Sequence, residues 1–195
     1  MVLWNKNLEC DFTVRCPWCE SSDLYRKYHD EEWGKPVHDD KIHFEFLVLE
    51  SAQSGLSWIT ILKKRENYRI EYSNFDPKIV ASYDENKVLK MLENPGIVRY
   101  RKKIESSINN AKKFLKIQKE FGSFDEYIWS FTSKEIVRNR WTNSNEVPAK
   151  TELSDRIARD LKKRGFKFLG STTIYSYLQA IGIVNDHLLG CRFRD

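Results

Sequence analysis

The stretch LKMLENPGIVRYRKKIESSINNAKKF, residues 89–114, contains two amphipathic helical patterns joined by a turn at Pro95 and Gly96. Four basic residues flank the start of the second pattern: Arg99, Arg101, Lys102 and Lys103. A glycine turn at a helix N-terminus can point successive backbone N–H groups outward, where they bind phosphate. The stretch therefore predicts a hairpin that holds nucleic acid by its backbone without reading base sequence. An ordinary connection between two helices explains the spacing equally well.

Helical periodicity extends over most of the chain. Apolar residues recur at three- and four-residue spacing over residues 24–33, 57–72, 84–93, 99–121, 153–164 and 172–181. Residues of the types that cap helix N-termini stand at five suitable positions: Asp23, Asp39, Asp84, Ser123 and Ser154. The segments Ile42–Leu49 and Ser171–Leu178 also suit strands, but no hairpin turn follows either. We therefore expect an all-α fold, with residues 132–152 as one long loop.

Length and composition indicate one globular domain. The 195 residues are 41% hydrophobic and 13% aromatic, which is enough apolar mass for a core. We expect this domain over residues 15–195, after an N-terminal tail of residues 1–14. No apolar run is long enough to span a membrane, and the first residues lack the order of a secretion signal. We therefore expect a cytoplasmic protein, and its net charge of +5 permits an anionic partner.

Aromatic residues surround one carboxylate in the first third of the sequence. Tyr25 and Tyr28 share a helical face, Trp33 follows, and Glu50 comes directly after the apolar run FLVL and before Trp58. A carboxylate near an apolar surface needs a partner or a ligand that is cationic or donates hydrogen bonds. Taken singly, an exposed Glu50 and ordinary core aromatics would explain the same residues.

His187 and Cys191 lie four residues apart near the end of the chain, and they would share one face if their segment were helical. They would form half of a tetrahedral metal site, so two further ligands are needed. Cysteines of a reducing compartment are thiols or metal ligands more often than disulfides. Common catalytic signatures, including the phosphate-binding G-x-x-x-x-G-K and the zinc-binding H-E-x-x-H, are absent from the sequence.

Taken in order, six motifs resemble the 3-methyladenine DNA glycosylase I family of the helix-hairpin-helix superfamily. They are YHDEEWG, LESAQSGLSWITILKKRENYR, NPGIVRYRKKI, WSF, LKKRGFKFLG and NDHLLGC. The resemblance covers about residues 15–191 and implies a helical glycosylase fold, with the helix-hairpin-helix at about residues 84–119. It also implies a monofunctional hydrolase that flips 3-methyladenine out of alkylated double-stranded DNA and excises it, which initiates base excision repair.

The resemblance assigns roles to individual residues. Glu50 matches the family's base-recognition glutamate and is the expected catalytic residue. The expected base-binding residues are Tyr28, Glu50, Trp58, Trp18, Trp33 and Tyr25. The expected DNA-backbone contacts are Gly96, Ile97, Val98, Arg99 and Arg101. Lyase-type members of the superfamily carry a Schiff-base lysine where this chain has Tyr100, so no lyase activity is expected.

The resemblance also completes the metal site. Cys16, His29, His187 and Cys191 match the family's metal positions, which implies one structural zinc ion per chain, joining the two termini. Cys19 forms C-x-x-C with Cys16 and could compete as a ligand. Cys10, His38 and His43 match no family position and are expected to be ordinary surface or core residues.

Two other functions use the same residues. A zinc-stapled helical module could bind DNA through the hairpin without catalysis, but it would not need Glu50 beside Tyr28 and Trp58. A related glycosylase for another lesion would differ only in the pocket, and the carboxylate favours a cationic purine. We expect a monomer, with alkylated DNA as the partner and no protein partner inferred.

Overall fold

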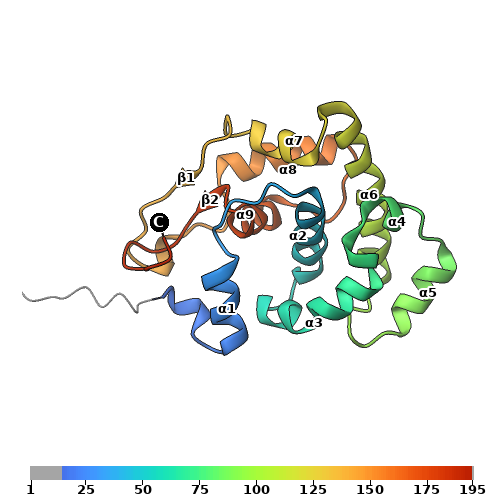
Figure 1. Cartoon of the computed structure of the whole chain (residues 1–195), viewed down its shortest axis with the longest axis horizontal. Helices are drawn as coiled ribbons and strands as arrows, with labels where there is room; N and C mark the ends of the chain where they lie inside the picture. The colour runs from blue at the N-terminus through green and yellow to red at the C-terminus, as the bar shows by residue number, and fades with distance from the viewer. Residues whose placement is uncertain (1–14, 195) are drawn as a thin grey trace, which may run out of the picture.

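The structure, a computed structural model, describes residues 15–194, which are mainly helical (Figure 1). Its α-helices are α1 (Asp23–Glu31), α2 (Asp40–Gln53), α3 (Trp58–Glu71), α4 (Pro77–Ala81), α5 (Glu85–Glu93), α6 (Arg101–Phe121), α7 (Phe124–Ser130), α8 (Glu152–Lys163) and α9 (Ser171–Ala180). The helical prediction is thus confirmed, including both segments that also suited strands. No helix in this part of the chain is long and apolar enough to cross a membrane. The predicted tail, residues 1–14, and Cys10 within it lie outside the described residues.

Helix α2 forms the centre of the fold. All of its residues from His43 to Ala52 are buried, so it has no solvent-facing side in that range. Figure 1 shows α3 below α2, with α9 on one side of it and α6 on the other. Phe44 of α2 contacts Phe114 of α6 at a ring separation of 5.3 Å, and Phe114 stacks on Phe124 at 4.3 Å. A helix buried on all sides holds its side chains rigidly, which matters because α2 carries Glu50.

Side-chain caps fix several helix starts. Asp39, Asp84 and Ser123 cap α2, α5 and α7 as predicted, each accepting a hydrogen bond from a backbone amide of the first turn. The predictions for Asp23 and Ser154 are wrong. Ser22 caps α1, and Thr151 caps α8 in a reciprocal capping box in which Ser154 is the third helical residue.

Short elements depart from the predicted pattern. Helices α4 and α7 were not predicted from the sequence, because a helix of about two turns or less is too short to show a clear apolar period. The predicted loop of residues 132–152 contains strand β1 (Val137–Arg138), which pairs in parallel with β2 (Val184–Asn185). There are also short 3-10 turns at Pro17–Cys19, Ser73–Phe75 and Ser144–Glu146. The β1–β2 pairing brings the segment before His187 against the body of the protein.

Candidate functional site: an aromatic pocket beside a cysteine and histidine cluster

A pocket of about 200 Å³ lies where α1, α2, α3 and α9 meet. Its lining residues are Trp18, Tyr25, Tyr28, Trp33, Glu50, Gln53, Trp58, Ser176 and Gln179. The structure therefore brings together all six residues predicted to bind a base. Pockets for drug-sized ligands start near 300 Å³, so this cavity suits one planar ring system.

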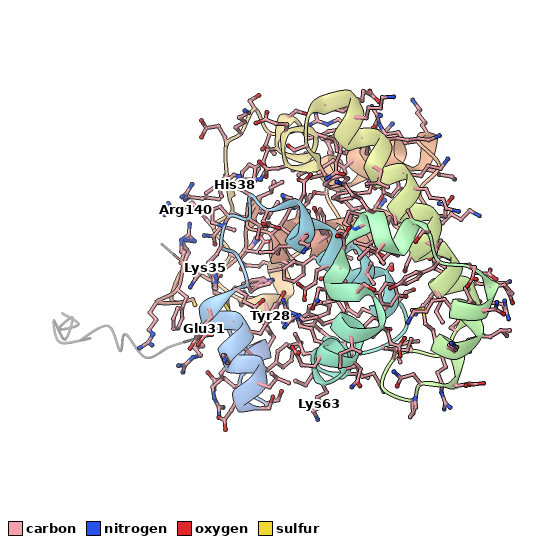
Figure 2. The ribbon with its side chains drawn as sticks, turned by 45° about the vertical axis from the view of Figure 1, so that its right-hand side comes forward. Tyr28, Glu31, Lys35, His38, Lys63 and Arg140 are labelled. Carbon is pink, nitrogen blue, oxygen red and sulfur yellow. The ribbon has the colours of Figure 1, made fainter. Side chains whose placement is uncertain are left out.

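Aromatic rings form the walls of this pocket. The ring centroids of Tyr28 and Trp58 are 5.5 Å apart, and Trp18 lies 4.9 Å from both Tyr25 and Trp33 in edge-to-face contacts. Figure 2 shows Tyr28 directed from α1 toward the body of the molecule, whereas Lys63 of α3 lies at the periphery. Because ring faces carry partial negative charge, such walls attract a flat cation.

Glu50 supplies the pocket with a carboxyl group that has no protein partner. It is only 4% exposed, and no hydrogen-bond partner or cation lies within reach of its carboxyl among residues 15–194. Burial raises the pKa of this carboxyl from its usual 4.5 to about 8. An ionised Glu50 is therefore unfavourable in the empty pocket, and a cationic ligand would favour it.

A second polar atom of the pocket residues is also without a partner. The indole Nε1 of Trp58 is fully shielded from solvent, and it finds no hydrogen-bond partner in the described part of the chain. Unpaired buried polar atoms are rare and occur where a ligand or water completes the site. Burial also raises the pKa of Tyr28 well above its usual value, so its hydroxyl stays neutral. The pocket thus holds one ionisable acceptor, Glu50, among neutral aromatic groups.

Four side chains from the two ends of the described chain form a cluster next to this pocket. Ligand atoms of Cys16, His29, His187 and Cys191 all lie within 4.8 Å of one another, and all four residues are buried. The Sγ atom of Cys191 is 3.5 Å from Nε2 of His29 and 3.3 Å from Nδ1 of His187. A tetrahedral zinc ion with ordinary bond lengths separates sulfur and nitrogen ligands by about 3.6 Å. The donor set and spacing therefore fit a metal ion with four protein ligands.

The two imidazoles are oriented for metal binding by their other ring nitrogens. Nδ1 of His29 donates to the Asp30 carboxylate at 2.8 Å, and Nε2 of His187 donates to the Trp33 carbonyl oxygen at 3.1 Å. Both partners can only accept, so the nitrogens that face the cluster carry lone pairs. Arg15 in turn binds Asp30, with its Nε 2.9 Å from the carboxylate.

The thiols of the cluster are coupled. A hydrogen bond with Cys191 and burial raise the pKa of the Cys16 thiol, whereas the hydrogen bond from Cys16 lowers the pKa of Cys191. One proton is therefore shared, and the pair readily holds a thiolate, which is the form that binds metals.

The structure also shows how His187 and Cys191 meet and where the other cysteine and histidines of the described chain lie. Residues 186–191 are not helical, so His187 and Cys191 meet through turns rather than along a helix face. Cys19 lies outside the cluster, and its Sγ donates to the carbonyl oxygen of Cys16. His38 is exposed, and the buried His43 lies between Tyr177 and Asp125. Both histidines therefore lie outside the cysteine and histidine cluster.

The predicted DNA hairpin is the connection between α5 and α6. The amide of Gly96 donates to Asn94 Oδ1 at 2.7 Å, and that of Val98 donates to the Tyr68 hydroxyl at 3.1 Å. These two amides were expected to face a phosphate, but both donate to side chains inside the protein. Arg101 pairs with Glu85 and Glu105. Arg99 forms no ion pair with any residue of the described chain, which leaves its guanidinium available to an anion.

Sequence reasoning did not identify three of the pocket residues. Gln53 lies one turn after Glu50 on α2, and Ser176 and Gln179 lie three residues apart on α9. The non-buried positions of α9, including Thr172, Ser176 and Gln179, follow a three- and four-residue spacing that could have indicated a polar face. Nothing in their sequence connects that face with Glu50.

Fold and pocket together define a helical protein with an aromatic pocket that suits a flat, cationic ring. The profile of the family described as methyladenine glycosylase matches residues 18–195. DNA-3-methyladenine glycosylase 1 from Escherichia coli (strain K12) is 46% identical over 177 residues, which cover 91% of this chain and 95% of that relative. DNA-3-methyladenine glycosylase from Haemophilus influenzae is 44% identical over 179 residues, covering 92% and 97%. The chain belongs to the methyladenine glycosylase family.

A solved structure extends this similarity to three dimensions. A variant of 3-methyladenine DNA glycosylase I crystallised in complex with 3-methyladenine has a TM-score of 0.90 to this structure and 35% sequence identity. The alignment covers 93% of this chain and 97% of that one. The predicted family is therefore confirmed, and with it the helical glycosylase fold.

Proposed function

We propose that the protein excises 3-methyladenine from alkylated DNA by hydrolysing its N-glycosidic bond, as the first step of base excision repair. The relatives at 44–46% identity are DNA-3-methyladenine glycosylases, and they align over more than nine-tenths of the chain. The observation that carries the proposal is the buried carboxyl of Glu50, which has no protein partner and lines an aromatic pocket. That carboxyl can accept hydrogen bonds from the exocyclic amine of a cationic adenine.

The charge of the lesion explains why so few catalytic groups are needed. Methylation at N3 makes the base cationic while it is attached to DNA, so the electron pair of the breaking C1′–N9 bond leaves on a neutral base. Water then adds its oxygen to C1′ and loses a proton to solvent. Glu50 and the rings of Tyr28 and Trp58 hold the extruded base in position for this step. Neutral adenine gains much less from the same pocket.

The hairpin between α5 and α6 is proposed to hold the DNA backbone. Its predicted contacts are Gly96, Ile97, Val98, Arg99 and Arg101, and the internal hydrogen bonds described above favour Arg99 and the first turn of α6 among them. A helix N-terminus with an unpaired arginine beside it suits a phosphate. Tyr100 stands in place of a Schiff-base lysine, so we expect no strand cleavage.

We further propose that the cysteine and histidine cluster holds one structural zinc ion. Zinc would supply a rigid four-ligand junction there, with no open position for a reacting water. Cys16 and His29 lie near the start of the described chain and His187 and Cys191 near its end, so the ion would join the two. We propose that the enzyme acts as a monomer on duplex DNA in the cytoplasm, where thiol ligands stay reduced.

Base release from methylated DNA tests the proposed function. The purified protein is incubated with duplex DNA methylated in vitro, and the released bases are separated by chromatography. We expect 3-methyladenine to be released, and Glu50→Gln to lower the excision rate by about tenfold or more because a neutral amide cannot offset the positive base. If no 3-methyladenine is released while DNA still binds, the protein is a DNA-binding module instead. Full activity of Glu50→Gln would exclude the role of this carboxyl.

A further inference from the structure

Lys103 lies buried on the first turn of α6, directly after the hairpin. It is 9% exposed, and its Nζ donates to the carbonyl oxygens of Ala52 at 2.8 Å and Ser54 at 2.7 Å. Lysines are almost never this buried unless their charge is compensated. Among the residues that the structure describes, no carboxylate forms an ion pair with Lys103, so these two carbonyl groups are its direct partners.

The two carbonyls belong to the end of α2, the helix that carries Glu50. The last carbonyl groups of a helix have no partner within the helix and carry partial negative charge, which a cation stabilises. Burial lowers the pKa of Lys103, so the desolvation of its amine is a real cost. A buried amine held at a helix C-terminus is therefore an arrangement that packing alone does not explain.

The segment that Lys103 holds forms one edge of the pocket. Gln53 and Trp58 both line the pocket, and residues 54–57 connect them. This connection leaves α2 through Gly55 with a φ of +83°, and it presents Leu56 with 42% of its surface exposed. Lys103 itself does not line the pocket. Its two hydrogen bonds thus fix the pocket edge against the helix that follows the hairpin.

We infer that Lys103 is a positioning residue that sets the distance between the DNA-backbone hairpin and the base pocket. A backbone held at the hairpin delivers its extruded base to the pocket only if the 54–57 connection stays in place. Small displacements of a bound substrate lower the rate strongly while leaving binding nearly unchanged. The inference rests on the proposed function, since it concerns the excision of a base from DNA.

A direct chemical role for this lysine does not fit its geometry. A Schiff base would need the amine to reach the sugar of the flipped nucleotide, but the amine is directed to two backbone carbonyls outside the pocket lining. Desolvation is also the sole cause that raises the pKa of Glu50, so the charge of Lys103 does not set the ionisation of that carboxyl. Its effect must therefore pass through the 54–57 connection.

Two substitutions at Lys103 separate positioning from packing. Lys103→Met keeps about the same side-chain length and removes both hydrogen bonds, whereas Lys103→Arg keeps hydrogen-bond donors but is bulkier. Lys116→Met removes an exposed charge from the same helix, far from the hairpin, and serves as the control. The measurements are single-turnover excision from methylated duplex at saturating enzyme, affinity for free 3-methyladenine, and the unfolding midpoint.

We expect Lys103→Met to lower single-turnover excision by about tenfold to a hundredfold, with the affinity for free base changed less than about threefold. Lys103→Arg should retain more excision than Lys103→Met at a temperature where both are folded. Simple packing predicts the opposite order, because the apolar methionine fits a buried site better. Equal losses in excision and free-base affinity would overturn the inference, as would full excision by Lys103→Met. If wild type and control both fail to excise, the proposed function itself is wrong.

Discussion

His187 and Trp33 connect the cysteine and histidine cluster with the aromatic pocket. Nε2 of His187 donates to the carbonyl oxygen of Trp33 at 3.1 Å, and the two rings meet edge to face at 4.6 Å. Trp33 lines the pocket, and His187 contributes to the cluster. The Cβ of any residue replacing Gly34 would lie 2.9 Å from the His187 ring, so the ring packs against the backbone after Trp33 and leaves no room for a side chain there. A metal ion would thus stabilise one wall of the pocket.

Loss of Cys191 should reduce stability more than catalysis. If the proposed zinc ion is present, we expect Cys191→Ser to lose it and to have a free energy of unfolding lower by about 2 to 4 kcal/mol, since a ligand of the proposed structural site is removed. Excision should persist at temperatures where the variant stays folded. Metal content by atomic spectroscopy and thermal unfolding test this. Cys19→Ser is the matched control, because Cys19 lies outside the cluster. A Cys191→Ser protein with one zinc per chain would show that another ligand replaces Cys191.

Asp30 should tune the affinity of the cluster for its metal. It accepts a hydrogen bond from Nδ1 of His29 at 2.8 Å and thereby orients Nε2 toward the cluster. We expect Asp30→Asn to lower zinc affinity by about tenfold or more, as such supporting partners do in other sites. Competition with a chromogenic chelator measures the affinity. Asp23→Asn removes an exposed carboxylate from the same helix and should bind zinc like wild type, so equal affinities for the two variants would contradict the prediction.

Glu50 should make the folded protein less stable as pH rises. Burial raises its pKa from 4.5 to about 8, so between these values the folded state binds more protons than the unfolded state. The contribution of Glu50 to the free energy of unfolding is therefore greatest below about pH 4.5, and it decreases as the pH rises to about 8. We expect wild type to lose about 2 to 4 kcal/mol more than Glu50→Gln between pH 5 and 9. Urea unfolding across this range measures the difference, and parallel pH profiles would refute the assignment.

The sequence predicts those site residues that a local pattern marks, and it does not predict those that only tertiary packing brings to the pocket. Glu50 stands out because an acid follows FLVL directly, and the family resemblance implies its role. Ser176 and Gln179 could not be found the same way, since only the packing of α9 against α2 brings them to the pocket. Long amphipathic helices are predictable from local periodicity, whereas contacts between distant segments depend on tertiary packing.

Lys103 illustrates the same limit on a smaller scale. The sequence places it in a basic run beside Arg99 and Arg101, which suggests contact with phosphate. Its helical register nevertheless agrees with Ser107 and Phe114, which are buried on the core side of α6. That register was available from the sequence, but the carbonyl groups that receive its amine were not.

Gly96 should be required for the close approach of the hairpin to α3. A Cβ at this position would lie 2.4 Å from Cγ of Asn67 and 2.8 Å from its Cβ, both too short for ordinary contact. We expect Gly96→Ala to displace the hairpin, to lower stability by about 1 to 3 kcal/mol and to weaken binding of duplex DNA. Adding Asn67→Ala removes the atoms beyond its Cβ and should restore part of both losses, whereas Gly170→Ala, with open space around it, should change little. Unfolding and DNA-binding titrations of the single and double variants measure the coupling. Residues in direct contact show coupled effects when both are substituted. If the losses of the two single variants add up to the loss of the double variant, contact with Asn67 is not the reason that position 96 requires glycine.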